Sequence, residues 1–324
     1  MTVSRVVNDG KNVRETTRAA VMAAIRELNY APNQAARSLA GSESVRVGLL
    51  YSNPSAAYLS EFLVGVLDGA SRKATQITLE KCDVATSAQV AAVRKLMAGG
   101  IEAVILPPPL CESDALLEEL KLQKLPAVVV ACGRYNPKAI CVRIDDMAAA
   151  FEMTNYLLGL GHRRIGFIRG HPNLSASAER EKGFVKALQE SGIALDAALT
   201  AQGYFTYRSG MEAAERLLLA SPRPTAIFAS NDDMAAGAIS VAHRNGLDVP
   251  GNLSVVGFDD SSIATTVWPE LTTIHQPISA MAEIALGLAC RAVCKLRAGG
   301  EPKAINHQVS YSRVERESAA SPKI

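Results

Sequence analysis

Arg180, Asn231 and Asp259 carry the most informative chemistry in this sequence of 324 residues. A guanidinium donates hydrogen bonds, a carboxylate accepts them and an amide does both, so the three together suit a ligand whose hydroxyls donate and accept. Asn231 follows the apolar run 226–230, and Asp259 ends the run 253–258. Side chains at the carboxyl ends of neighbouring parallel strands face a common cleft. The sequence therefore predicts a binding site for a polyol.

The usual patterns of catalysis are missing from the sequence. It has no Gly-x-Ser-x-Gly elbow, no phosphate-cradling GxxxxGK[ST] loop and no HExxH metal pair. Adjacent acids such as Asp145 and Asp146 point in different directions and do not form an acid/base pair. The six cysteines form no CxxC pair, and Cys290 and Cys294 are predicted to be two packed thiols on one helix face. We expect no catalytic residue, no metal and no cofactor, and hence no enzyme.

From residue 45 onward, short apolar runs alternate with amphipathic stretches, which is typical of parallel sheets with helices on both faces. Two series of such units predict two lobes, each the size of one domain, with a ligand cleft between them. The predicted strands are 45–51, 77–81, 103–106, 127–131 and 141–144, then 164–169, 199–203, 226–230 and 253–258. The predicted helices are 57–74, 87–99 and 113–121, then 177–191, 207–220 and 232–245.

The end of the chain is expected to cross between the lobes. Segment 271–277 returns to the first lobe, the helix 279–297 completes it, and a strand at 304–313 returns to the second. The predicted domains are a head at 1–32, a hinge at 33–44, a first lobe at 45–147 plus 277–303, a second lobe at 148–276 plus 304–316, and a tail at 317–324.

The first 46 residues differ from the rest in charge. They carry seven Lys and Arg against four Asp and Glu, net +3, which leaves −1 of the total +2 for the other 278 residues. Their pattern predicts a helix exposing Ser4 and Arg5, a turn, an amphipathic helix at 14–28 and a short helix at 33–39 that Pro32 helps to start. A positive field there suits a nucleic acid. Since no run of 18 apolar residues and no signal peptide occurs, we expect a cytoplasmic protein without membrane contact.

Motifs along nearly the whole chain resemble the lactose/galactose repressor (LacI/GalR) family. They are the runs TVSRVVN at 2–8, LNYAPNQAARSL at 28–39, LGHRRI at 160–165, NDDMA at 231–235 and GFDD at 257–260. The resemblance implies a helix-turn-helix head, a hinge helix and a two-lobed α/β core like that of periplasmic binding proteins. It also implies a homodimer, because one recognition helix per subunit would read each half of a palindromic operator in double-stranded DNA.

The resemblance assigns DNA contacts within the head and hinge. Arg5 is the candidate for bidentate pairing with guanine, which discriminates by about 1–3 kcal/mol. Leu39 matches the hinge leucine that wedges into the minor groove, with packing on the core lobes as the alternative. The full set of predicted DNA contacts is Thr2, Ser4, Arg5, Asn8, Asn33, Arg37 and Leu39.

In the core, Arg180, Asn231 and Asp259 match the family's effector contacts. Phe205 falls where an aromatic ring stacks on the ligand, although it could equally belong to the core, and Tyr58 lies at the first lobe's side of the cleft. His162 is expected to be structural, capping a helix, and Asp232 and Asp260 are expected to be helix caps or loop acids. The expected effector is a sugar or related polyol rather than a purine. The resemblance makes relief of repression the commoner response and corepression the alternative, and the sequence itself does not determine the sign.

The sequence departs from the family at its start, where only Met1 precedes Thr2. The resemblance implies one further helix there, and a short isolated helix is marginally stable. We therefore expect this chain to bind operator DNA weakly or not at all. The missing helix is explained by a start that was placed too late or by a truncated product, and the full protein would be an ordinary repressor. The alternative is a cytoplasmic ligand-sensing or dominant-negative subunit that no longer binds DNA.

Overall fold

The computed structural model describes residues 6, 14–27, 44–73, 75–83, 85–134, 136–137 and 139–323. These fall into two compact units, residues 1–44 and 45–324, which are treated separately. In the first unit, helix α2 (Glu15–Glu27) confirms the amphipathic helix predicted at 14–28. The seven predicted DNA contacts lie outside the described residues: Thr2, Ser4, Arg5, Asn8, Asn33, Arg37 and Leu39.

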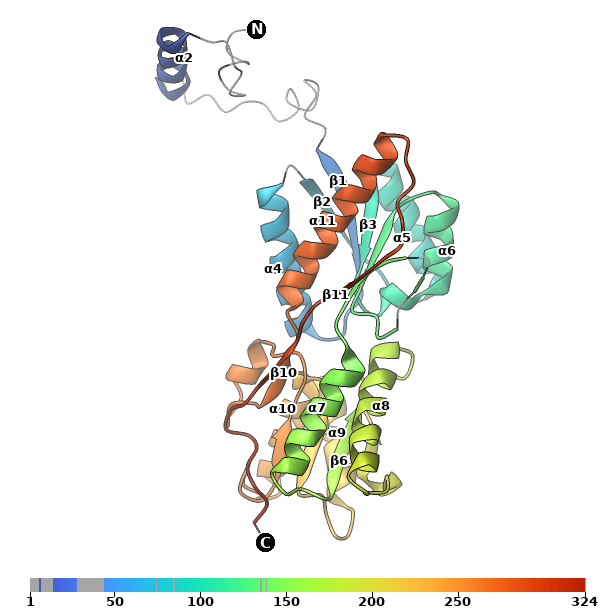
Figure 1. Cartoon of the computed structure of the whole chain (residues 1–324), viewed down its shortest axis with the longest axis vertical. Helices are drawn as coiled ribbons and strands as arrows, with labels where there is room; N and C mark the ends of the chain where they lie inside the picture. The colour runs from blue at the N-terminus through green and yellow to red at the C-terminus, as the bar shows by residue number, and fades with distance from the viewer. Residues whose placement is uncertain are drawn as a thin grey trace. The chain divides into compact units, whose positions relative to one another are not determined.

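A six-stranded parallel sheet forms the first lobe of the second unit. Its strands are β1 (Val45–Tyr51), β2 (Thr75–Lys81), β3 (Ala103–Leu106), β4 (Ala127–Val130), β5 (Ile140–Arg143) and β11 (Ile305–Gln308). They lie in the order β11-β5-β4-β3-β1-β2. Figure 1 labels β1, β2, β3 and β11 of this lobe. Successive side chains of a strand point to opposite faces. Ala103 and Ile105 accordingly pack into one cluster, and Val104 and Leu106 pack into another.

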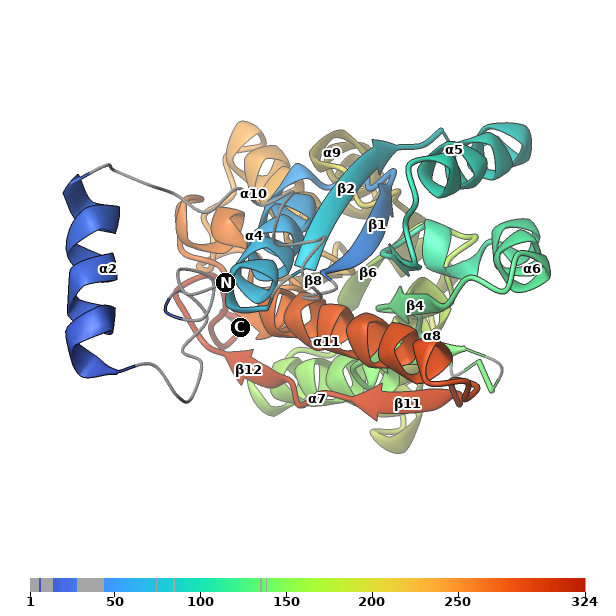
Figure 2. The ribbon, with the colours of Figure 1, turned by 90° about the horizontal axis from the view of Figure 1, so that it is seen from above.

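Helices cover both faces of this sheet. They are α4 (Ala56–Arg72), α5 (Thr86–Ala98), α6 (Asp114–Leu122) and α11 (Ile278–Arg297). Figure 2 shows α4 and α11 on one face and α5 and α6 on the other. Both faces of the central strands are therefore buried, which explains why the sequences of those strands are continuous apolar runs rather than alternating apolar and polar residues.

The second lobe repeats this plan with a four-stranded parallel sheet in the order β7-β6-β8-β9. Its elements are α7 (Asp146–Gly159), β6 (Ile165–Arg169), α8 (Ser175–Glu190), β7 (Thr200–Gln202), α9 (Tyr207–Leu218), β8 (Ala226–Ala229), α10 (Asp232–Arg244) and β9 (Ser254–Val256). Phe167 stacks on Phe184 at a centroid distance of 4.6 Å on the α7 and α8 side. Ile168, the next residue, packs on the opposite side with α9 and α10.

Three segments connect the lobes. The first joins β5 to α7, the second joins β10 (Thr273–His275) to α11, and the third joins β11 to β12 (Ser312–Val314). Because three short segments span the junction between the lobes, the angle between the lobes can change through rotation about only a few backbone torsions. Short 3-10 helices lie at Leu110–Glu112, Ala197–Leu199 and Ser262–Thr265.

The prediction of one strand at 304–313, returning to the second lobe, is wrong in part. β11 pairs in parallel with β5 and so belongs to the first sheet, whereas β12 pairs antiparallel with β10. β11 is exposed along its length. An edge strand with little burial leaves no apolar pattern from which its pairing could be predicted.

His162 has the structural role that the sequence predicted, but not as a helix cap. Its ring is buried, with Nδ1 2.9 Å from Thr225 Oγ1 and Nε2 3.0 Å from the carbonyl oxygen of Ala320. Burial lowers the pKa of His162, so the neutral ring is favoured. The ring thus fastens the C-terminal segment to the second lobe. In the part of the chain that the structure describes, no helix has the length and apolar character needed to cross a membrane.

Candidate ligand-binding site

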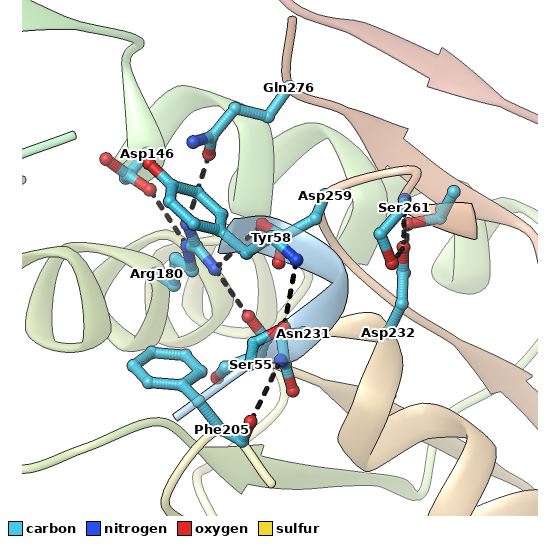
Figure 3. A network of polar contacts seen from close by, with 12 residues as sticks. Ser55, Tyr58, Asp146, Arg180, Phe205, Asn231, Asp232, Asp259, Ser261 and Gln276 are labelled. Atoms are coloured by element: carbon cyan, nitrogen blue, oxygen red, sulfur yellow. Dashed lines mark hydrogen bonds and ion pairs between the residues drawn. The ribbon is translucent and has the colours of Figure 1, made fainter. Parts of the chain in front are cut away.

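A pocket lies between the two lobes, and all five residues predicted to bind a ligand line it. They come from α4 in the first lobe and from α8 and the segments after β7, β8 and β9 in the second, as expected for a cleft at the carboxyl edges of two parallel sheets (Figure 3). The lining residues are Asn53, Pro54, Ser55, Tyr58, Pro108, Pro109, Ala131, Leu174, Ala176, Arg180, Phe205, Asn231, Asp259 and Gln276.

Arg180, on α8, is the polar centre of the pocket. Its Nε donates to Asp146 Oδ1 at 2.8 Å, its Nη1 donates to the carbonyl of Ser230, and its Nη2 donates to Gln276 Oε1 at 3.3 Å. The guanidinium carbon also lies 3.6 Å from the centre of the Phe258 ring. With 5% of its surface exposed, Arg180 is a buried charge that its partners fix in one orientation.

Asp259 lies in the loop after β9, close to the Arg180 guanidinium. Its Oδ1 lies 3.8 Å from Arg180 Nη1, which is an ion pair beyond hydrogen-bond distance. Its φ of +114° is a conformation that side-chain-bearing residues rarely adopt and that costs roughly 1–3 kcal/mol. Backbone hydrogen bonds to Ile274 and from Gln276 hold this turn. Burial raises the pKa of Asp259 well above its usual value, although Arg180 opposes that shift.

Asn231 and Phe205 form the floor of the pocket on the second lobe. Asn231 caps α10, because its Oδ1 accepts a 3.1 Å hydrogen bond from the backbone N–H of Met234. Its Nδ2 donates to the carbonyl of Phe205 at 3.3 Å and to Asp233 Oδ2 at 3.2 Å. The Phe205 ring is half-buried and packs on the second-lobe core while it lines the pocket, so both predicted roles are compatible with its position.

Tyr58 closes the pocket from the first lobe. It lies in the first turn of α4, stacks on Phe62 at 6.2 Å and is 6% exposed. Among the described residues its hydroxyl has no hydrogen-bond partner. Burial, and secondarily the charge of Asp259, raise its pKa well above the usual value, so the phenol keeps its proton. A buried hydroxyl without a partner is costly, and a ligand in the pocket could supply that partner.

Several pocket residues were missed by the sequence reasoning. Gln276 lies in the crossing segment, and its Nε2 is buried without a partner among the described residues. Ser55 caps α4 and donates a 2.6 Å hydrogen bond to Asp233 Oδ2 across the cleft. Two features of the sequence could have indicated these residues. Gln276 precedes Pro277 in the segment predicted to cross between the lobes, and Ser55 comes just before a predicted helix.

Further contacts hold the lobes together beside the pocket. The Ser175 backbone N–H donates to Glu112 Oε2 at 2.8 Å, so the carboxylate lies at the N-terminus of α8. Arg134 Nε donates to Glu179 Oε1 at 3.1 Å. A Cβ added at Gly133 would lie 2.4 Å from the backbone nitrogen of Ala176, so the backbones of the two lobes meet closely there. The lobes are thus in a closed arrangement.

The acids that the sequence assigned to structural roles have structural partners. Asp232 Oδ2 accepts from the Ser261 N–H at 2.8 Å, and its Oδ1 accepts from Thr273 Oγ1 at 2.6 Å. Asp260 lies 2.6 Å from Arg316 Nη2 and 3.0 Å from His275 Nδ1. The Asp232 and Asp260 carboxylates therefore stabilise the loop that contains Asp259.

The cysteines form no metal centre in the described part of the chain, where no group of three or more potential ligand residues occurs. Cys290 is half-buried and lies 3.4 Å from Thr75 Oγ1. Cys294 is exposed, so the prediction that both are packed thiols is wrong for Cys294. It lies one turn further along α11, near the exposed end of the helix.

Two family models match the chain. One, described as "Periplasmic binding protein-like domain", covers residues 154–319, and the other, "Bacterial regulatory proteins, lacI family", covers residues 1–33. Catabolite control protein A of Priestia megaterium is 32% identical over 96% of this chain and 93% of its own. The HTH-type transcriptional repressor PurR of Escherichia coli is 34% identical over 98% and 93%.

Solved structures agree with these matches. The lac repressor dimer bound to operator and the anti-inducer ONPF has a TM-score of 0.80 and 28% identity, over 98% of this chain and 94% of that one. The complex of the transcriptional regulator CelR with cellobiose has a TM-score of 0.77 and 28% identity, over 97% and 94%. Fold, cleft and matches together define a transcription regulator with a periplasmic-binding-protein-like core. The chain belongs to the lacI family of bacterial regulatory proteins, and the relatives named are regulators, not enzymes.

Proposed function

We propose that this chain is a repressor that acts in the cytoplasm as a homodimer and whose operator affinity depends on a small sugar-like effector in the interlobe pocket. The observation that carries the proposal is the convergence of Tyr58, Arg180, Phe205, Asn231 and Asp259 on one pocket. Relatives named as a repressor, as bound to operator and as bound to cellobiose support it.

The proposed mechanism couples the pocket to the head through the angle between the lobes. Residues on both lobes line the pocket, so an effector that contacts both favours one angle over another. That angle sets the spacing of the two first lobes in a dimer and hence the order of the hinge segments, which is coupling through a two-state element. We propose that effector binding lowers operator affinity and so relieves repression.

The effector class can be tested by calorimetry against sugars and nucleobases. A polyol can donate to Asp259 and accept from Gln276 at once, which is why we favour a sugar. We expect at least one sugar to bind and the bases to give no heat. Tight binding of a base without any response to sugars would contradict the proposed class.

The DNA-binding part of the proposal rests on Arg5, Asn8 and the hinge residue Leu39. A library of random duplexes, selected at low salt so that the weak binding expected of this chain is strong enough to enrich a sequence, should yield a palindromic consensus. Arg5→Ala should then lose about 1–3 kcal/mol of discrimination at one base pair of each half-site. Exposed Arg208 provides the control, since Arg208→Ala removes the same charge from α9 and should leave the consensus unchanged. Failure to enrich any sequence would contradict specific DNA binding.

A further inference from the structure

The parallel sheet gives the first lobe two distinct ends. Asn53, Pro108 and Ala131 line the pocket and follow β1, β3 and β4, so the carboxyl ends of the strands face the second lobe. The amino ends of all six strands therefore lie at the opposite end, and the helices that return along the sheet have their C-termini there. We call this surface the end face. It consists of residues 45–46, 73, 99–102, 121–126 and 295–303.

The chain enters the core at this end face. Val45 is the first residue of β1, so residues 1–44 are joined to the first lobe there. Figure 1 shows the start of β1 near the C-terminal end of α11. The Arg46 N–H donates to Glu102 Oε2 at 3.2 Å, and Arg297 Nη2 on α11 lies 2.6 Å from Glu102 Oε1. The segment that carries the head is thus attached to a hydrogen-bonded corner of the end face.

The end face is positively charged, although the core as a whole is neutral. Residues 45–324 carry 28 Lys and Arg and 28 Asp and Glu. The end face has seven cations against two acids, Glu102 and Glu301, which gives it a net charge of +5. Its exposed cations are Arg46, Lys73, Lys121, Lys124, Lys295, Arg297 and Lys303. Positive charge is therefore concentrated where the head is attached, and the rest of the core carries −5.

Most of these cations have no acidic partner in the described part of the chain. Among the seven, only Arg297 has an ion pair, with Glu102. Exposed cations on other helices are paired, as Lys182 is with Glu179 at 2.8 Å on α8. Six charges of the end face are therefore available to an anionic partner.

Helix geometry explains only part of this charge. Cations in the last turn of a helix are stabilised by its dipole, which accounts for Lys121 on α6 and Lys295 on α11. Arg46, Lys124 and Lys303 lie outside the helices and gain nothing from a dipole. Their position on one surface needs another explanation.

We propose that the end face binds the phosphate backbone of duplex DNA next to the site held by the head, without reading its sequence. A duplex carries one negative charge per about 1.7 Å of its axis, and cations bind it by releasing counterions. Six strands spaced by about 4.8 Å make the end face about 24 Å wide, so its cations can contact several phosphates. Attachment of the head at Val45 keeps bound DNA close to the end face, so even weak contacts add to the affinity. This inference rests on the proposed function, since it assumes that the head holds DNA.

The salt dependence of DNA binding by the full chain tests the inference. The probe is a long duplex of random sequence, titrated at several low salt concentrations. The end-face variant combines Lys124→Gln, Lys295→Gln and Lys303→Gln, which remove three exposed and unpaired charges. We expect weaker binding and a plot of log affinity against log salt whose slope is smaller by roughly 2 to 3, since each phosphate contact contributes about 0.9.

A charge-matched variant of the second lobe provides the control. It combines Arg216→Gln, Arg223→Gln and Lys323→Gln, all at exposed positions, and should keep the slope and affinity of the wild type. Equal slopes for the wild type and the end-face variant would overturn this inference alone. Equal losses in the two variants would also overturn it, because the effect would then follow total charge. No binding of the wild type to any duplex would overturn the proposed DNA binding as well.

Lysine acetylation, read by mass spectrometry, locates the contact directly. Lys124, Lys295 and Lys303 should lose reactivity when the duplex is added to the wild type, whereas exposed Lys323 should not. Unchanged reactivity of the three end-face lysines in a protein that binds the duplex would assign all phosphate contacts to the head and contradict the inference.

Discussion

Ser55 Oγ, in the first lobe, donates a 2.6 Å hydrogen bond to Asp233 Oδ2, in the second. Ser55 also caps α4, and Asp233 lies in the first turn of α10, so the bond joins the N-termini of two helices across the pocket. Burial raises the pKa of Asp233, whereas the hydrogen bonds from Ser55 and Asn231 lower it. The contact therefore links lobe closure directly to the groups that line the pocket.

Asp233→Ala should weaken effector binding. It removes the bond to Ser55 and leaves the Ser55 cap of α4 intact, so the closed arrangement loses about 1–3 kcal/mol and the Kd rises roughly fivefold to a hundredfold. Calorimetry measures the change. Asp114→Ala, an acid in the first turn of α6 and away from the cleft, should leave the Kd unchanged. Equal affinities in Asp233→Ala and the wild type would show that the bond does not contribute to closure.

Gly133→Ala should hold the lobes apart. The added Cβ would lie 2.4 Å from the backbone of Ala176, and backbone atoms cannot move aside as a flexible side chain can. We expect a larger radius of gyration by X-ray scattering and weaker effector binding. Gly159→Ala is the matched control, because a Cβ there meets nothing within 4 Å. If the two variants scatter alike, the close approach at Gly133 does not limit closure.

Arg180→Ala should destabilise the fold as well as the site. The change leaves Asp146 and Asp259 buried without their cation, which should lower the free energy of unfolding by about 3–5 kcal/mol. Urea unfolding measures it. Arg208→Ala, which breaks an exposed pair with Glu212, should change the value by less than about 1 kcal/mol. A loss of similar size in both variants would contradict the buried-charge argument.

Stability should depend on pH through Asp232. Burial raises its pKa to about 7 in the folded protein, against roughly 3.9 in the unfolded chain. Below pH 4 both states are protonated and the group has no effect. Between about pH 4 and 7 the folded state holds a proton that the unfolded state has released, so the free energy of unfolding falls as pH rises.

The slope from Asp232 is at most about 1.4 kcal/mol per pH unit, and Asp232→Asn should remove it. Urea unfolding of both proteins at several pH values between 4 and 7 measures the difference in slope, whatever the change in absolute stability. Parallel profiles for the wild type and Asp232→Asn would show that Asp232 does not retain a proton on folding.

Much of the fold and of the pocket could be predicted because the signals are local. Asn231 and Asp259 follow strands that the apolar pattern defines, and the carboxyl ends of such strands converge at one edge of a parallel sheet. Arg180 lies near the start of a helix that the pattern also predicts. β11 and Gln276 could not be placed in the same way. β11 is an exposed edge strand without an apolar pattern, and the role of Gln276 depends on where a crossing segment passes the other lobe.

The partners of His162 and the bond between Ser55 and Asp233 were also beyond prediction. Each joins residues that are far apart in the sequence, 158 positions for His162 and Ala320 and 178 for Ser55 and Asp233. No periodicity carries information over such separations. Only the packing of the two lobes brings these groups together.

The most direct test of the account is the effector Kd measured with and without saturating operator duplex, at low salt so that phosphate contacts are strong. If the pocket controls DNA binding, operator must change the effector Kd by the same factor by which effector changes the operator Kd, since coupling is reciprocal. We predict weaker effector binding in the presence of operator, by roughly tenfold or more. An effector Kd that operator leaves unchanged would contradict the account.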